Sequence, residues 1–182
     1  MSILSEWKLA RDRRKRAMVY LSTITPIVGP TDSDWLTSMA PAASEALIVR
    51  ELQFARRALG LIVAERDALD DRTASDVAHQ LASVINLEAR RDADVGRAWS
   101  ERWRAYTSAF SSRGSAEAPA ARLARVMLSA TGVESPTTEQ LVRATQYVLS
   151  VRSAANEALR TAFGAASLPE DVRPSAVRPV LR

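Results

Sequence analysis

Residues 41–69 read PAASEALIVRELQFARRALGLIVAERDAL, and this stretch decides the fold of the chain. Its apolar residues recur every three or four positions, a spacing that places side chains on one side of a helix. The positions in this pattern are Ile48, Leu52, Ala55, Leu59, Ile62 and Leu69, with Arg66 standing where the pattern would be completed. Three more apolar residues, Leu47, Phe54 and Leu61, widen the apolar face. We therefore predict a long helix, with Pro41 in its first turn, that is covered on more than one side.

The composition of the whole chain favours helices in the same way. The chain has 182 residues, 47% of them hydrophobic, which is enough for one sizeable core. Alanine, leucine, arginine and glutamate are abundant, glycine is scarce, and the alternating β-branched runs of strands are missing. We predict an all-α fold: a helical bundle with a long helical hairpin, a basic N-terminal helix and an extended Pro-rich C-terminal tail.

Start and stop signals place the other helices. We expect a first helix from Ile3 to Ile24, and a short helix within residues 31–41 capped by Asp32 or Ser33. After a turn at residues 70–76, a helix that starts at Thr73 or Ser75 and runs toward Ser112 completes the hairpin. The sequence leaves open whether residues 74–112 form one helix or two, with Gly96 as the candidate break. The last two expected helices are residues 116–132, ending at Gly132, and a helix capped by Ser135 and ending at Phe163-Gly164.

Three parts follow along the chain. Residues 1–30 are expected to form the basic N-terminal helical arm, residues 31–166 the helical bundle, and residues 167–182 the Pro-rich tail. Val-Arg-Pro occurs twice in the tail, at 172–174 and 177–179. Each residue before a proline is pushed into an extended conformation, so this tail cannot continue the last helix.

The formal net charge of +4 is confined to the N-terminal segment. Residues 1–24 hold six basic and two acidic residues, whereas the rest of the chain holds 19 of each sign. The basic residues are Lys8, Arg11, Arg13, Arg14, Lys15 and Arg16. They point in nearly every direction around the expected helix, unlike the single basic face of a membrane-surface helix. Because the apolar run that follows, residues 17–29, is short and contains hydroxyl residues and a proline, we expect neither a membrane span nor a cleaved secretory signal.

The residues present give little support for catalytic activity or for metal binding. The chain has no cysteine, which excludes disulfides, thiolate metal ligands and cysteine nucleophiles. His79 is its one histidine, and only Asp76 lies near it at helical spacing, too few ligands for a metal site. No phosphate-binding loop or dinucleotide motif is present. We therefore expect no enzymatic activity, no cofactor and no small-molecule substrate.

One stretch, WSERWRAYTSAF at residues 99–110, carries an aromatic stripe of Trp99, Trp103, Tyr106 and Phe110. A cofactor platform is disfavoured because no histidine or cysteine lies near it. Helix packing within the chain and contact with another protein both remain open.

The function that these features favour is a non-catalytic structural or adaptor subunit that stabilises a larger multi-protein assembly. Its basic arm would dock on an acidic protein surface or on anionic lipid headgroups, and its tail would lie in a groove of the partner. The expected location is the cytoplasm, with a peripheral position at the inner membrane of a bacterium as one form of it. The residues expected to bind the partner are Trp7, Lys8, Arg11, Arg13, Arg14, Lys15, Arg16, Trp35, Trp99, Trp103, Tyr106, Arg173, Pro174, Arg178 and Pro179.

The alternative is a helical protein that binds nucleic acid through the basic arm. Lysine and arginine neutralise phosphates, and Trp99 and Trp103, with arginines beside them, could stack on bases. The neutral body and the lack of a helix-turn-helix pattern place this alternative second.

Overall fold

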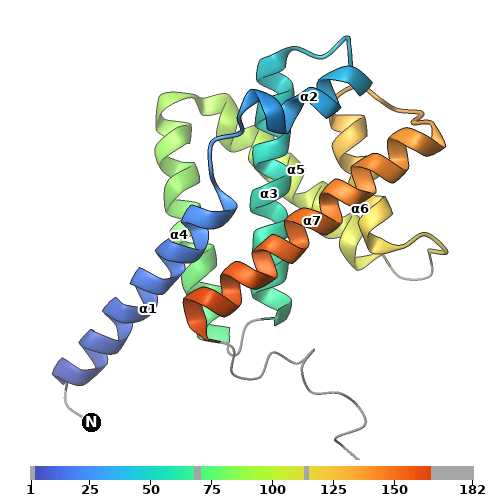
Figure 1. Cartoon of the computed structure of the whole chain (residues 1–182). Helices are drawn as coiled ribbons and strands as arrows, with labels where there is room; N and C mark the ends of the chain where they lie inside the picture. Colours follow the sequence, from blue (N-terminus) through green and yellow to red (C-terminus); the bar gives the residue numbers. More distant parts are fainter. Residues whose placement is uncertain (1–2, 68–70, 113–114, 165–182) are drawn as a thin grey trace, which may run out of the picture.

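Helix α3 (Glu45–Asp67) is the central element of the fold (Figure 1). The computed structural model describes residues 3–67, 71–112 and 115–164, and within these ranges it contains seven helices and no strand. The other six are α1 (Ile3–Ile24), α2 (Pro30–Met39), α4 (Asp71–Arg91), α5 (Ala93–Ser111), α6 (Pro119–Ala130) and α7 (Thr138–Phe163). All six contact α3. The all-α bundle is therefore confirmed, while the tail, residues 167–182, lies outside the described residues.

Two hydrophobic cores meet on α3, which explains why its apolar face is wider than a single stripe. The first lies between α1, α3, α4 and α7, and α3 contributes Leu61, Val63 and Ala64 to it. The second lies between α2, α3, α5, α6 and α7, and here α3 contributes Ile48, Leu52, Ala55, Ala58 and Leu59. Coverage of α3 on more than one side is thus confirmed, although Leu69 lies outside the described residues.

The start of α3 differs from the prediction. The helix begins at Glu45, four residues after Pro41, because Ser44 acts at its N-terminus. The side-chain oxygen of Ser44 accepts a hydrogen bond from the backbone nitrogen of Leu47 at 3.3 Å, and its carbonyl accepts from Ile48 at 3.1 Å. A serine that satisfies a free backbone donor in this way marks a helix start more strongly than the proline before it.

The predicted N-caps of α2 and α7 were also wrong. Gly29 is the N-cap of α2 and Pro30 is its first residue, because the fixed backbone angle of proline suits the first turn. At α7 the cap is Thr137, not Ser135. The Thr137 hydroxyl accepts from the Gln140 backbone nitrogen (3.2 Å) while the Gln140 side chain accepts from the Thr137 nitrogen (2.8 Å), which is a complete capping box. The predicted ends, Gly132 after α6 and Gly164 after α7, are confirmed, and both glycines have positive φ.

The long hairpin is shorter than expected, because residues 71–111 form two helices. The break is at Asp92, not at Gly96, which lies inside α5. Asp92 has an extended backbone (φ −143°), and its carboxylate accepts a hydrogen bond from the backbone nitrogen of Asp94 at 3.0 Å. This cap starts α5 as a separate helix, which packs on α3, α4 and α6. The second arm of the predicted hairpin is therefore α4 without α5. Helix α4 itself begins at Asp71, before the predicted starts.

Helix α1 belongs to the core through its second half. Ala17, Tyr20, Leu21 and Ile24 are all buried. The Tyr20 hydroxyl donates a hydrogen bond to the Gly60 carbonyl at 2.7 Å, and a Cβ at position 60 would lie 2.2 Å from Cδ1 of Ile24. The absence of a side chain at Gly60 therefore lets α1 approach α3 closely.

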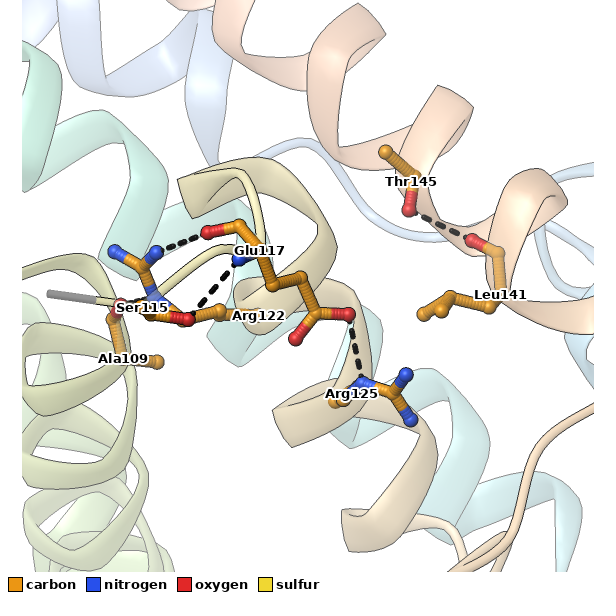
Figure 2. Close-up of polar contacts among 7 residues, drawn as sticks. All are labelled: Ala109, Ser115, Glu117, Arg122, Arg125, Leu141 and Thr145. Atoms are coloured by element: carbon orange, nitrogen blue, oxygen red, sulfur yellow. Dashed lines mark hydrogen bonds and ion pairs between the residues drawn. The ribbon is translucent and has the colours of Figure 1, made fainter. Parts of the chain in front are cut away.

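The connection from α5 to α6 is held by Arg122 and Arg125 (Figure 2). Arg122 Nε donates to the Ala109 carbonyl at 2.6 Å near the end of α5, and its Nη1 donates to the Glu117 carbonyl. Arg125 Nε donates to the Glu117 carboxylate at 2.8 Å. These contacts fix the start of α6 against the end of α5, which seals one end of the second core.

Candidate interaction surface

The N-terminal half of α1 projects away from the rest of the bundle (Figure 1). Within it, residues 7–16, which we call the basic segment, contain all six cations of the predicted arm. Nine of its ten residues are exposed, among them Trp7, Lys8, Arg11, Arg14, Lys15 and Arg16. Arg13 alone is half-buried, because it points toward α4 and its Nε lies 3.2 Å from Asp76 Oδ2. One cation of the segment therefore attaches it to the bundle and five face solvent.

The charge of the basic segment is not balanced locally. Asp12 is its one acidic residue, and apart from Arg13 none of its cations forms an ion pair with an acidic side chain that the structure describes. Excess positive charge on a projecting helix produces a potential that attracts anionic surfaces and speeds encounter with them.

An exposed aromatic ring accompanies this charge. The Trp7 side chain is 60% exposed, and the Arg11 guanidinium carbon lies 5.5 Å from its ring centroid. Beside Trp7, a depression of about 560 Å³ separates α1 from α4. Its lining includes Arg11 and Arg14 on α1, and Asp76 and His79 on α4. Trp7 can therefore insert into a partner while the arginines contact acidic groups around it.

The other residues expected to bind a partner lie elsewhere. Trp35 is half-buried on α2, and its ring packs on Tyr147 with centroids 5.0 Å apart. Trp99 and Trp103 are half-buried and stacked on each other at 5.9 Å, and both contact the two cores. Tyr106 is fully buried. The aromatic stripe thus packs against its own bundle, and Arg173, Pro174, Arg178 and Pro179 lie outside the described residues.

A buried ionic cluster, which the sequence did not indicate, connects α3 to α5. Glu51 is 2% exposed, and its carboxylate accepts hydrogen bonds from the Tyr106 hydroxyl (2.6 Å) and from Arg102 Nε (2.8 Å). Burial raises the pKa of Glu51, and the hydrogen bond from Tyr106 and the charge of Arg102 act in the opposite direction. The one signal in the sequence was position: Glu51 adjoins Leu52 inside an otherwise apolar stretch.

The raised pKa of Glu51 predicts a specific pH dependence of stability. The folded protein binds the Glu51 proton more tightly than the unfolded chain does. The protonated Glu51 therefore contributes stability that is fully present below the ordinary pKa of 4.5 and is lost as the pH rises through the raised pKa of the folded state. We expect urea unfolding at a series of pH values to show this loss for the natural protein and not for Glu51→Gln. Glu101→Gln, at an exposed position, should show the same loss of stability as the natural protein. If the free energy of unfolding changed with pH equally in the natural protein and in Glu51→Gln, the pH dependence would not come from Glu51.

A second ion pair, between the buried Arg57 and the half-exposed Glu88, connects α3 to α4. The Arg57 side chain is 6% exposed, and its two terminal nitrogens donate to the two carboxylate oxygens of Glu88 at 2.7 and 2.6 Å. Such a bidentate pair fixes both the distance and the orientation of the two helices. The pair uses both terminal nitrogens of Arg57 and both carboxylate oxygens of Glu88, so it serves as a structural contact between the two helices.

Neither a metal site nor a membrane span emerges from the described part of the chain. No three histidine, aspartate or glutamate side chains gather there in an arrangement that could hold a metal ion. None of the described helices combines the length and the apolar character needed to cross a membrane. Comparison with known proteins found no matching family model, no similar curated protein and no similar solved structure.

Proposed function

We propose that this protein is a non-catalytic adaptor subunit whose basic segment docks on an acidic surface of a partner protein within a larger assembly. The observation that carries this proposal is the arrangement of α1: its second half is buried against α3, whereas residues 7–16 present five exposed cations and Trp7. Tryptophan and arginine are enriched at protein interfaces and among the few residues that contribute most of the binding energy.

The distribution of the exposed residues favours a protein partner over a lipid bilayer. Trp7 and Leu9, both more than half exposed, are two positions apart and so lie on opposite sides of the helix. Arg14 and Arg16, both exposed and also two positions apart, likewise lie on opposite sides. A flat bilayer contacts one face of a helix, whereas a partner protein can surround a projecting helix with acidic groups. Nucleic acid is second, because the rest of the chain is electrically neutral and adds nothing to a phosphate-binding surface.

The test compares charge reversal in the basic segment with charge reversal elsewhere. In extracts of the native cells, the amount of partner protein recovered with the variant Arg11→Glu/Arg14→Glu/Lys15→Glu should be roughly tenfold or more below the amount recovered with the natural protein. The matched control, Arg90→Glu/Arg91→Glu on the exposed end of α4, should retain the partner. Circular dichroism should show the same helix content for all three proteins.

Two further binding measurements distinguish lipid and nucleic acid from a protein partner. The purified protein is mixed with phosphatidylglycerol vesicles and, separately, with double-stranded and single-stranded DNA at 150 mM salt. Binding to vesicles or DNA that the triple variant loses, with no protein partner in the extracts, would overturn the adaptor proposal in favour of lipid or nucleic acid. Equal recovery of the partner with the natural protein and the triple variant would overturn the role of the basic segment.

A further inference from the structure

A cleft that the adaptor role leaves unused lies between the end of α1, the start of α2, α3 and α7. Its volume is about 590 Å³, which lies in the range of small-molecule sites. Its apolar walls are Ile24, Pro26, Trp35, Val151, Ala154 and Ala155. Its polar lining is Thr23, Thr31, Asp32, Arg56, Tyr147 and Ser150. An apolar cleft with a few polar groups gathered at one place is the usual form of a ligand site.

Arg56 is the main polar group of this cleft, and it is held in place by two neighbours. Its Nε donates to the Tyr147 hydroxyl at 3.1 Å, and its Nη2 lies 3.2 Å from Asp32 Oδ2. The side chain is 15% exposed, so its guanidinium is largely withdrawn from solvent yet still reaches the cleft. A guanidinium has five N–H donors, and the two contacts engage two of its three nitrogens.

Tyr147 adds a second donor at the same place. Its oxygen accepts the hydrogen bond from Arg56, which leaves its own proton free to be donated. Burial raises the pKa of Tyr147, so the hydroxyl keeps this proton at neutral pH. The Trp35 ring packs on the Tyr147 ring with a 37° tilt, which fixes the orientation of the hydroxyl and forms an aromatic wall.

The start of α2 brings further positive character to the cleft. Thr31 lines it from the first turn of α2, where the helix dipole is positive. Asp32 offsets part of this charge, but its side chain is 48% exposed at the rim and one of its oxygens is used by Arg56. Arg56 therefore keeps N–H donors that its contacts with Asp32 and Tyr147 do not use.

We propose that this cleft binds a small organic carboxylate with a flat apolar body, its carboxylate at Arg56 and Tyr147 and its body against Trp35 and Val151. An arginine with a neighbouring hydroxyl matches the two oxygens of a carboxylate, and the apolar walls match the rest of the ligand. The site lies outside the basic segment, so its occupancy is independent of the proposed adaptor function.

The test uses 3-phenylpropionate as the probe and follows backbone amide shifts of the full chain by NMR. A ligand of this size should bind weakly, with a Kd on the order of a few millimolar. The shifts should centre on residues such as Ser150 and Ala154. The neutral 3-phenylpropionamide and the cationic 2-phenylethylamine should each bind roughly tenfold more weakly, because they lose the charged contact.

A filling variant tests the location without removing any hydrogen-bonding group. Ala154 is exposed and lines the cleft, so Ala154→Leu on α7 should occupy the cleft, keep the fold and abolish the shifts. Ala82→Leu, at an exposed position of α4 away from the cleft, should leave binding unchanged. Retained binding in Ala154→Leu, shifts spread over other surfaces, or equal binding of the amide or the amine would each overturn the proposal.

Discussion

Glu88→Ala is expected to lower the free energy of unfolding by about 3 kcal/mol, because it leaves the Arg57 guanidinium without its counter-ion. Arg57 is 5% exposed, and both of its terminal nitrogens are bonded to Glu88 in the natural protein. Its Nε is buried and has no hydrogen-bond partner among the described residues, so Glu88 alone binds this side chain there. The measurement is urea unfolding at neutral pH, followed by circular dichroism.

Two controls distinguish loss of this pair from loss of any glutamate. Glu101→Ala removes an exposed glutamate from α5 and should change the unfolding free energy by less than about 0.5 kcal/mol. The double variant Arg57→Met/Glu88→Ala removes both charges and should recover most of the lost stability, since an apolar replacement needs no counter-ion. A loss below about 1 kcal/mol in Glu88→Ala would show that water reaches the guanidinium through the half-exposed position of Glu88.

Leu52→Ala is the second large change, with an expected loss of about 3 kcal/mol. Leu52 is fully buried in the second core, between α3 and the helices that surround it. The shortened side chain removes apolar contacts and leaves a cavity that the packed helices close only in part. Thermal unfolding and urea unfolding should both register the loss.

The matched control is Leu149→Ala on α7, where the side chain is 47% exposed. This change should cost less than about 1 kcal/mol, because a half-exposed leucine gains less from burial. A similar loss at both leucines would contradict the assignment of α3 as the central helix. The binding of 3-phenylpropionate by Leu149→Ala should be unchanged, since Leu149 does not line the cleft.

How far the sequence predicted the fold can be judged from particular elements. The apolar spacing of residues 41–69 predicted a helix covered on more than one side, because burial on two sides leaves a wider apolar face in the sequence itself. The boundaries of α1 were predicted correctly, since prolines and a glycine follow Ile24. The break at Asp92 was missed, because an aspartate within a polar stretch is equally compatible with a solvated helix and with an N-cap.

The candidate sites also differ in whether the sequence alone could predict them. The basic segment is visible in the sequence, because a cluster of like charges is local information. The cleft is not, since Asp32, Arg56 and Tyr147 come from three helices and only the packing of α2 and α7 on α3 brings them together. The same holds for Glu51, whose partners Arg102 and Tyr106 lie about fifty residues away along the chain. Polar groups that pair across helices leave no periodic pattern.

The continuity of α1 from its buried residue Tyr20 to its projecting end has a consequence for the strength of binding. A basic tail without fixed structure loses conformational entropy when it binds, at about 1–2 kcal/mol for each residue that becomes ordered. In α1, residues 7–16 already belong to the helix whose second half is fixed by Tyr20 on Gly60. Their backbone entropy is therefore lost during folding rather than during association. A short preorganised segment of this kind can bind tightly with few contacts and can discriminate between partners by the positions of its charges.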